Sequence, residues 1–335
     1  MRRLFAGLTV TMLLLAACGS SGGSDDATPT EALTGALDGL ETMDSLTTTF
    51  SLISTPESLQ AAASEDGGEL SAEDAAKILD SSLTVSGETS GAPGAPAEII
   101  LNVAGENVIE VRAIDETLYA RADVNALAET FGGDPAEISA VADQLAAGGM
   151  IYVKPAVDGE WLGLQGFKQF VEGYAGQPAE TDASAEDKQL VEQFTASIKD
   201  NASVTEAGSD DAGRHLVASV PLREAYQDYA KLAENLSSGV GGAGIPGGEL
   251  PDAAEIPDEN AKLDVWVRDG QVTQIEFDFL QVRAWTDEQP PEGLETMALR
   301  VALADFSGEV AVPEDPVVVT PEQILQDFAG GSMTG

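Results

Sequence analysis

The chain has 335 residues, of which 16 are Lys or Arg and 58 are Asp or Glu, so its net charge is −42. A surface this acidic repels phosphate backbones and anionic headgroups, and we therefore expect no nucleic-acid partner and no electrostatic adhesion to a membrane. The single cysteine excludes an intramolecular disulfide, so stability has to come from an apolar core, which 43% hydrophobic residues can supply.

The first 17 residues have the pattern of a secretory signal. Arg2 and Arg3 precede an apolar run over 4–17 that ends in small residues. This run is shorter than the roughly 20 residues that a membrane-spanning helix needs. With Phe5, the two arginines loosely resemble a twin-arginine signal, but general secretion is the expected export route.

Cys18 directly follows Leu-Ala-Ala, and this stretch resembles the lipobox of bacterial lipoproteins. The resemblance implies cleavage before Cys18, a thioether-linked diacylglycerol on its sulfur, and an N-terminus that is free or carries a further acyl group such as palmitate. Two acyl chains hold a protein firmly where one is marginal. We therefore expect the mature chain to be lipid-anchored on the extracytoplasmic face of the cell membrane.

Residues 18–29 are rich in Gly, Ser and Asp and predict a flexible tether. A helix capped by Thr30 follows, and then a strand over 46–53 in which polar and apolar residues alternate. The acidic, Ala-rich stretch 56–80 reads as an insertion. Further strands are predicted at 83–85, 99–103, 108–114 and 117–121. We expect residues 30–335 to form a single domain.

The rest of the chain alternates helices and strands. Helices are expected after Asp123, from Pro135, and over 166–174 and 190–198, with short strands at 150–154 and 161–164. A hairpin is predicted over 203–220 and a helix from Pro221, before a Gly/Pro-rich second insertion at 237–257. The strongest hairpin signal places strands 263–267 and 272–279 on either side of Asp269-Gly270. A long strand at 296–306, an edge strand at 317–319 and a terminal helix from Pro321 complete the prediction.

These elements predict an α+β fold with about ten or eleven antiparallel strands, since tight turns join consecutive strands. One face of the sheet is markedly apolar and the other polar. A sheet of this width curls, and the inserted helices are the expected cover of its apolar face.

Three passages carry a family resemblance: 117–131, 262–280 and 303–313. Together with the export signal, they resemble the LolA/LolB lipoprotein carriers, and still more the actinobacterial LppX/LprAFG-type lipoproteins. The resemblance implies an unclosed half-barrel around a hydrophobic cavity that holds a lipid.

Inward-facing apolar side chains are the candidates for lining such a cavity. The same residues fit an ordinary core, and the sequence leaves both interpretations open. The candidate lining residues are Phe50, Leu52, Val265, Phe277, Phe279, Leu299 and Val301.

The sequence speaks against an enzyme. His215 is the only histidine and no second cysteine exists, so a metal site built on several imidazole or thiolate ligands is excluded, and no metal or cofactor is expected. No nucleophile elbow or phosphate-binding loop occurs. The sequence therefore predicts a monomeric lipoprotein that binds or carries a lipid or other apolar ligand. The alternative is a surface module with a solid core that binds an envelope protein or modulates a sensor.

Overall fold

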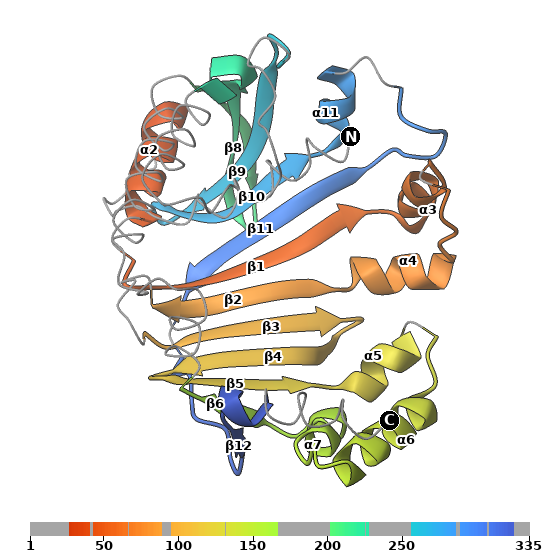
Figure 1. Ribbon diagram of the computed structural model, residues 1–335. Helices are drawn as coiled ribbons and strands as arrows, with labels where there is room; N and C mark the ends of the chain where they lie inside the picture. Colours follow the sequence, from red (N-terminus) through yellow and green to blue (C-terminus); the bar gives the residue numbers. More distant parts are fainter. Residues whose placement is uncertain are drawn as a thin grey trace. The chain divides into compact units, whose positions relative to one another are not determined.

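The structure is a computed structural model of the chain (Figure 1). It describes residues 27–40, 43–65, 67–88, 95–130, 132–166, 202–224, 226–227, 256–285, 289–306 and 308–324. The chain divides into two compact units. Unit 1 comprises Met1–Asp44 and Asp182–Ala304, and unit 2 comprises Ser45–Thr181 and Asp305–Gly335. The predicted signal and Cys18 lie outside the described residues. The predicted helix at 190–198 and all but the first residue of the one at 166–174 lie outside them too.

In its described residues, unit 1 is an antiparallel sheet with the helix Pro29–Leu40 packed on it. Its strand order is β11-β10-β9-β8-β7. The described elements are α2 (Pro29–Leu40), β7 (Ser203–Asp210), β8 (Gly213–Pro221), β9 (Asn260–Arg268), β10 (Gln271–Asp278), α11 (Leu280–Trp285) and β11 (Met297–Asp305). The predicted hairpin between β9 and β10 is confirmed, because Asp269 and Gly270 both have positive φ, as a type I′ turn requires.

Helix α2 covers the apolar face of the unit 1 sheet by contacting β7, β9 and β10. Its inward residues Ala32, Leu33, Ala36, Leu37 and Leu40 are all buried. The cap is Thr28 and not the expected Thr30. Thr28 and Glu31 exchange a capping-box pair of hydrogen bonds, with Pro29 between them at the first helical position.

Unit 2 is built on a seven-stranded sheet in the order β12-β6-β5-β4-β3-β2-β1. Its helices follow strand ends: α3 and α4 lie between β1 and β2 in the chain, and α5, α6 and α7 between β5 and β6 (Figure 1). The strands are β1 (Ser45–Ser54), β2 (Ser82–Glu88), β3 (Ala97–Val103), β4 (Glu106–Ile114), β5 (Thr117–Ala122), β6 (Leu162–Gln165) and β12 (Val317–Val319). The helices are α3 (Pro56–Glu65), α4 (Ala72–Leu79), α5 (Val124–Thr130), α6 (Pro135–Ala147) and α7 (Val153–Val157).

Two local predictions need correction. The predicted strand at 150–154 is a turn leading into α7, because Met150 N–H donates to Leu145 O at 3.1 Å and Val153 N–H donates to Met150 O at 3.1 Å. These local bonds satisfy the backbone without a partner strand. The edge strand β12 exists as predicted, but it runs parallel to β6. It starts beside Trp161, whose carbonyl accepts from Val317 N–H at 2.8 Å.

The predicted α+β class and the mainly antiparallel sheet are confirmed. The described residues form twelve strands, slightly more than expected. In the described part of the chain, no helix is long and apolar enough to cross a membrane.

Candidate apolar binding face

The strand register of unit 2 collects apolar residues on one side of the sheet. Phe50 pairs with Leu83, Leu83 with Leu101, and Leu101 with Ile109. The next row in the same register joins Thr48, Val85, Ile99 and Val111. We call this side the unit 2 apolar face; it consists of Leu46, Thr48, Phe50, Leu83, Val85, Ile99, Leu101, Ile109, Val111, Ala113, Leu118, Ala120, Leu162 and Leu164.

This face remains accessible to water. Leu83 is 37% and Ile99 is 41% exposed, and apart from Leu46 the other members are only half-buried. The matching face of unit 1, under α2, is closed: Val265 and Ile275 are each 4% exposed and Leu216 is 0% exposed. Exposed apolar area costs free energy that burial would recover. The unit 2 apolar face is therefore a surface that another apolar group could cover favourably.

The opposite side of the unit 2 sheet is polar, and its side chains form hydrogen bonds with one another across the strands. Thr47 and Thr49 share hydrogen bonds with Ser86 at 3.1 Å and Thr84 at 3.0 Å across β1 and β2. Because side chains alternate along a strand, these pairs fix which residues of β1 and β2 face the apolar side.

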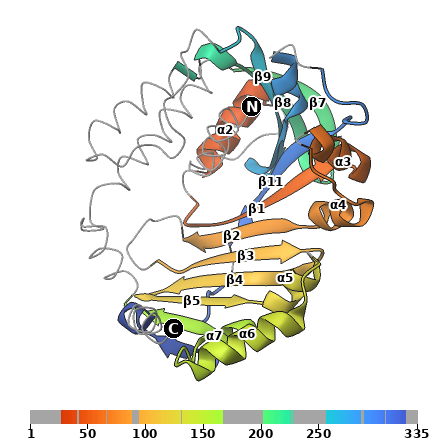
Figure 2. The same cartoon turned by 45° about the vertical axis from the view of Figure 1, so that its right-hand side comes forward.

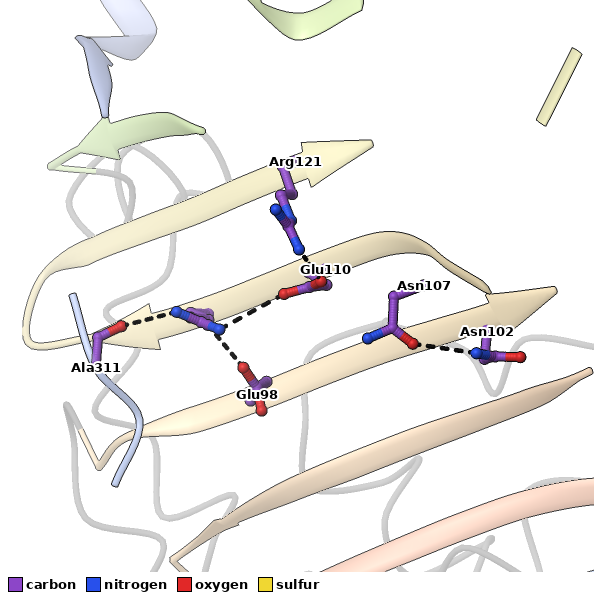
Figure 3. A network of polar contacts seen from close by, with 7 residues as sticks. Glu98, Asn102, Asn107, Glu110, Arg121 and Ala311 are labelled. Carbon is purple, nitrogen blue, oxygen red and sulfur yellow. Dashed lines mark hydrogen bonds and ion pairs between the residues drawn. The ribbon is translucent and has the colours of Figure 1, made fainter. Parts of the chain in front are cut away.

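A charged network covers the same polar side further along the sheet (Figure 3). The Glu110 side chain is buried and accepts from Arg121, and Arg112 Nη2 lies 3.5 Å from its other oxygen. Arg112 Nε also donates to Glu98 at 2.6 Å, and its Nη1 donates to Ala311 O at 3.1 Å.

Trp161 lies over both guanidinium groups of this network, with ring-centroid distances of 4.7 Å to Arg112 and 5.1 Å to Arg121. The positive charges of the two arginines neutralise the negative charges of Glu98 and Glu110, so this network carries no net charge. Charge on β4 and β5 is thus held away from the unit 2 apolar face, whose members carry none.

The structure separates the predicted lining residues into two groups. Val265, Phe277, Leu299 and Val301 share one face of unit 1, since β9, β10 and β11 pair Val265 with Ile275, Ile275 with Val301, and Phe277 with Leu299. Val265, Phe277 and Val301 are buried, and Leu299 is half-buried. This is the face that α2 covers.

Phe279 is half-buried just beyond β10, where its N–H donates to Met297 O at 2.8 Å. Its ring contacts Phe277 edge to face at 5.5 Å. A lining role for the unit 1 residues stays a prediction.

Phe50 and Leu52 belong to unit 2, and both are half-buried. Phe50 lies on the unit 2 apolar face, and Leu52 continues the alternation of β1 just past its pairing with β2. The same face contains five residues that were not among the candidates predicted from the sequence: Leu83, Ile99, Leu101, Ile109 and Val111. Their sequence signal was the alternation along β4, where Ile109, Val111 and Ala113 alternate with the charged residues Glu110 and Arg112. Strand β4 folds back on β3 through the turn at Ala104-Gly105.

His215 is held on the polar side of unit 1 by two neighbours. Its Nε2 lies 2.7 Å from Asp264 Oδ1, and its ring stacks on Trp266 with centroids 4.2 Å apart and planes 2° from parallel. Trp266 donates its Nε1–H to Asp210 at 2.8 Å. This hydrogen bond is the main reason that the pKa of Asp210 lies below its usual value, and a second hydrogen bond, from the Ala212 backbone N–H, lowers the pKa further.

The arrangement around His215 fits a structural cluster on a sheet face, with each polar group bonded to its neighbour. Within the described residues, no three His, Cys, Asp or Glu side chains are grouped so that they could hold a metal ion.

Comparison with known proteins yields structural neighbours. No family model matches the chain. No curated protein matches it either. Among solved structures it is similar to the Mycobacterium tuberculosis lipoprotein LppX, with 9% identity and a TM-score of 0.35 over 87% of this chain and all of that one. It is similarly matched to LprF from Mycobacterium bovis, with 9% identity and a TM-score of 0.35 over 88% of this chain and all of that one. LppX and LprF are both of the type that the sequence passages resemble.

Proposed function

We propose that the protein is a lipid-anchored, extracytoplasmic lipoprotein that binds a lipid or other apolar ligand on the unit 2 apolar face and performs no chemistry on it. The observation that carries this proposal is the half-exposed state of that face, whereas the apolar face of unit 1 is closed. The anchor is the diacylglycerol expected on Cys18.

The chemistry of the face selects an aliphatic ligand. Thirteen of its fourteen members are apolar, the exception being Thr48, and Phe50 is the only aromatic residue among them. Hydrocarbon chains gain free energy there by removing apolar surface from water, on the order of 25 cal/mol per Å². The face offers no charged group to an ionised headgroup.

A binding experiment with matched variants tests the proposal. The mature chain, residues 18–335, is kept in solution by Cys18→Ser and titrated with a fluorescent fatty acid, and native mass spectrometry records co-purified apolar molecules. Leu83→Gln and Ile99→Gln together should weaken probe binding about tenfold, which corresponds to ~1.4 kcal/mol of lost contact.

The control is Ile78→Gln, because Ile78 is also aliphatic and is 39% exposed, but lies on α4. It should leave probe binding unchanged. Protein that carries no apolar molecule and takes up no probe would contradict the proposal, as would equal losses in the control and the double variant.

The alternative function is a module that binds an envelope protein and carries no ligand. The closed core of unit 1 under α2 favours it for that unit. A ligand-free protein that captures a membrane partner, and loses this partner on deletion of 237–257, would support it. Most of that segment lies outside the described residues.

A further inference from the structure

Helices α6 and α7 of unit 2 contact one another (Figure 2). Three large aliphatic side chains are exposed on α6 and in the turn that leads to α7. Val141 is 56%, Leu145 is 37% and Ile151 is 71% exposed. We call these three residues the α6–α7 patch. Isolated exposed aliphatic residues are common, but a group of them marks an interaction surface.

Backbone hydrogen bonds hold the segment before Ile151 against the end of α6. Val141 and Leu145 are four residues apart and therefore lie one above the other on α6. Helix α6 ends at Ala147, and its C-cap Gly148 donates its N–H to Gln144 O at 3.0 Å. Gly149 then takes a φ of 111°, and Met150 N–H returns to Leu145 O at 3.1 Å. The chain thus folds back on the last turn of α6, and Ile151 follows directly after this bond.

The burial of its residues shows which side of α6 is exposed to solvent. Ala142 is the buried residue of the helix, so its side faces the unit. Glu137, Val141 and Leu145 form an exposed stripe along one flank, spaced by four residues. This stripe runs from an acidic end to an apolar end.

The surroundings of the patch are strongly acidic. Residues 124–166 contain six acidic residues (Glu129, Asp134, Glu137, Asp143, Asp158 and Glu160) and one basic residue, Lys154, so their net charge is −6 + 1 = −5. Lys154 is itself engaged, at 2.9 Å from Asp158 and 3.7 Å from Asp143. The patch is therefore bordered by negative charge that its own neighbours leave largely uncompensated.

This charge selects among the surfaces that could cover the patch. An anionic membrane is repelled by it, and a second copy of the chain would bring two regions of −5 together. A helix with an apolar stripe flanked by Lys and Arg satisfies both features, because its stripe packs on the aliphatic residues while its charges face the acidic border. We infer that the α6–α7 patch docks a basic amphipathic helix of a partner protein.

Peptide binding tests this inference, which is independent of the proposed lipid site. The probe is a synthetic 18-residue helix with Leu at helical spacing and Lys at the other positions, and the protein is the mature chain with Cys18→Ser. Fluorescence anisotropy at 0.15 M salt measures affinity, and hydrogen exchange locates the contact, which should protect residues 135–152.

The double variant Val141→Ser/Ile151→Ser should weaken peptide binding about tenfold or more, because two aliphatic contacts are lost. Glu137→Lys should weaken it severalfold, and less so at high salt. Val312→Ser is the matched control, since Val312 is 55% exposed at another place in unit 2, and it should leave the affinity unchanged.

Three results would overturn the inference. The first is equal binding of a peptide in which Glu replaces Lys. The second is an equal loss of affinity in the Val312 control. The third is absence of peptide binding together with a loss of another interaction in the double variant. A loss of vesicle binding would assign the patch to a membrane, and a loss of self-association in sedimentation would assign it to a second copy of the chain.

Discussion

The difference in packing between the two sheet faces can be measured with one pair of matched substitutions. Ile99 in β3 and Ile275 in β10 are both isoleucines within antiparallel strands, and they are 41% and 4% exposed. Ile99→Ala and Ile275→Ala remove the same atoms and lose a similar strand propensity. A difference in unfolding free energy between them therefore reports how well each site is packed.

The magnitudes follow from burial. Each substitution removes three methyl or methylene groups, worth about 0.8 kcal/mol apiece when fully buried. For Ile275 this gives about 2.4 kcal/mol, and the cavity left under α2 raises the loss to about 3–4 kcal/mol. For Ile99 about six-tenths of the transfer term applies and no closed cavity forms, so the expected loss is about 1.4 kcal/mol.

The assay has to resolve the two units, because a chain with two compact units need not unfold in one step. Urea unfolding followed by circular dichroism gives the overall change. Hydrogen exchange read by mass spectrometry gives the change in peptides from 97–122 and from 260–278. A loss for Ile99→Ala within about 0.5 kcal/mol of that for Ile275→Ala would refute the conclusion that the unit 2 apolar face is open.

Three further predictions concern other parts of the molecule. Arg112→Met should lower the free energy of unfolding by about 2–3 kcal/mol in the urea assay, since it removes one of two arginines from the buried Glu110 carboxylate. The control is Lys77→Met, which removes the partner of Glu73 in an exposed pair and should cost less than about 0.5 kcal/mol. Because the pKa of Asp210 is lowered in the folded state, its contribution to the free energy of unfolding is present above the ordinary aspartate pKa and is lost as pH falls through the folded value. The stability difference between the wild type and Asp210→Asn should therefore shrink below about pH 4. A constant difference from pH 3 to 7 would contradict this prediction. Cys18→Ser should move the protein from the membrane to the soluble extracytoplasmic fraction and remove the diacylglycerol mass from the mature chain; an unchanged membrane fraction would argue against the lipid anchor.

Much of the secondary structure was readable because it is encoded locally. The alternation of β1, the Asp269-Gly270 turn and the Ser71 cap of α4, whose hydroxyl accepts from Asp74 N–H at 3.0 Å, all depend on residues a few positions apart. The segment 150–154 was misread because its apolar residues fit a short strand, and only the hydrogen bonds back to α6 show the turn.

The candidate site was not readable in the same way. Ile99 and Ile275 stand in strands of similar pattern, and nothing within either strand tells whether a helix will pack on it. Burial is a property of what lies opposite a residue, so it depends on chain segments far away in sequence. The sequence alone determined the strands and their alternation, together with the expectation of an exported, acidic lipoprotein. The tertiary structure decided that α2 closes the apolar face of unit 1 while that of unit 2 stays accessible, because this depends on where a helix more than 200 residues from β10 comes to rest.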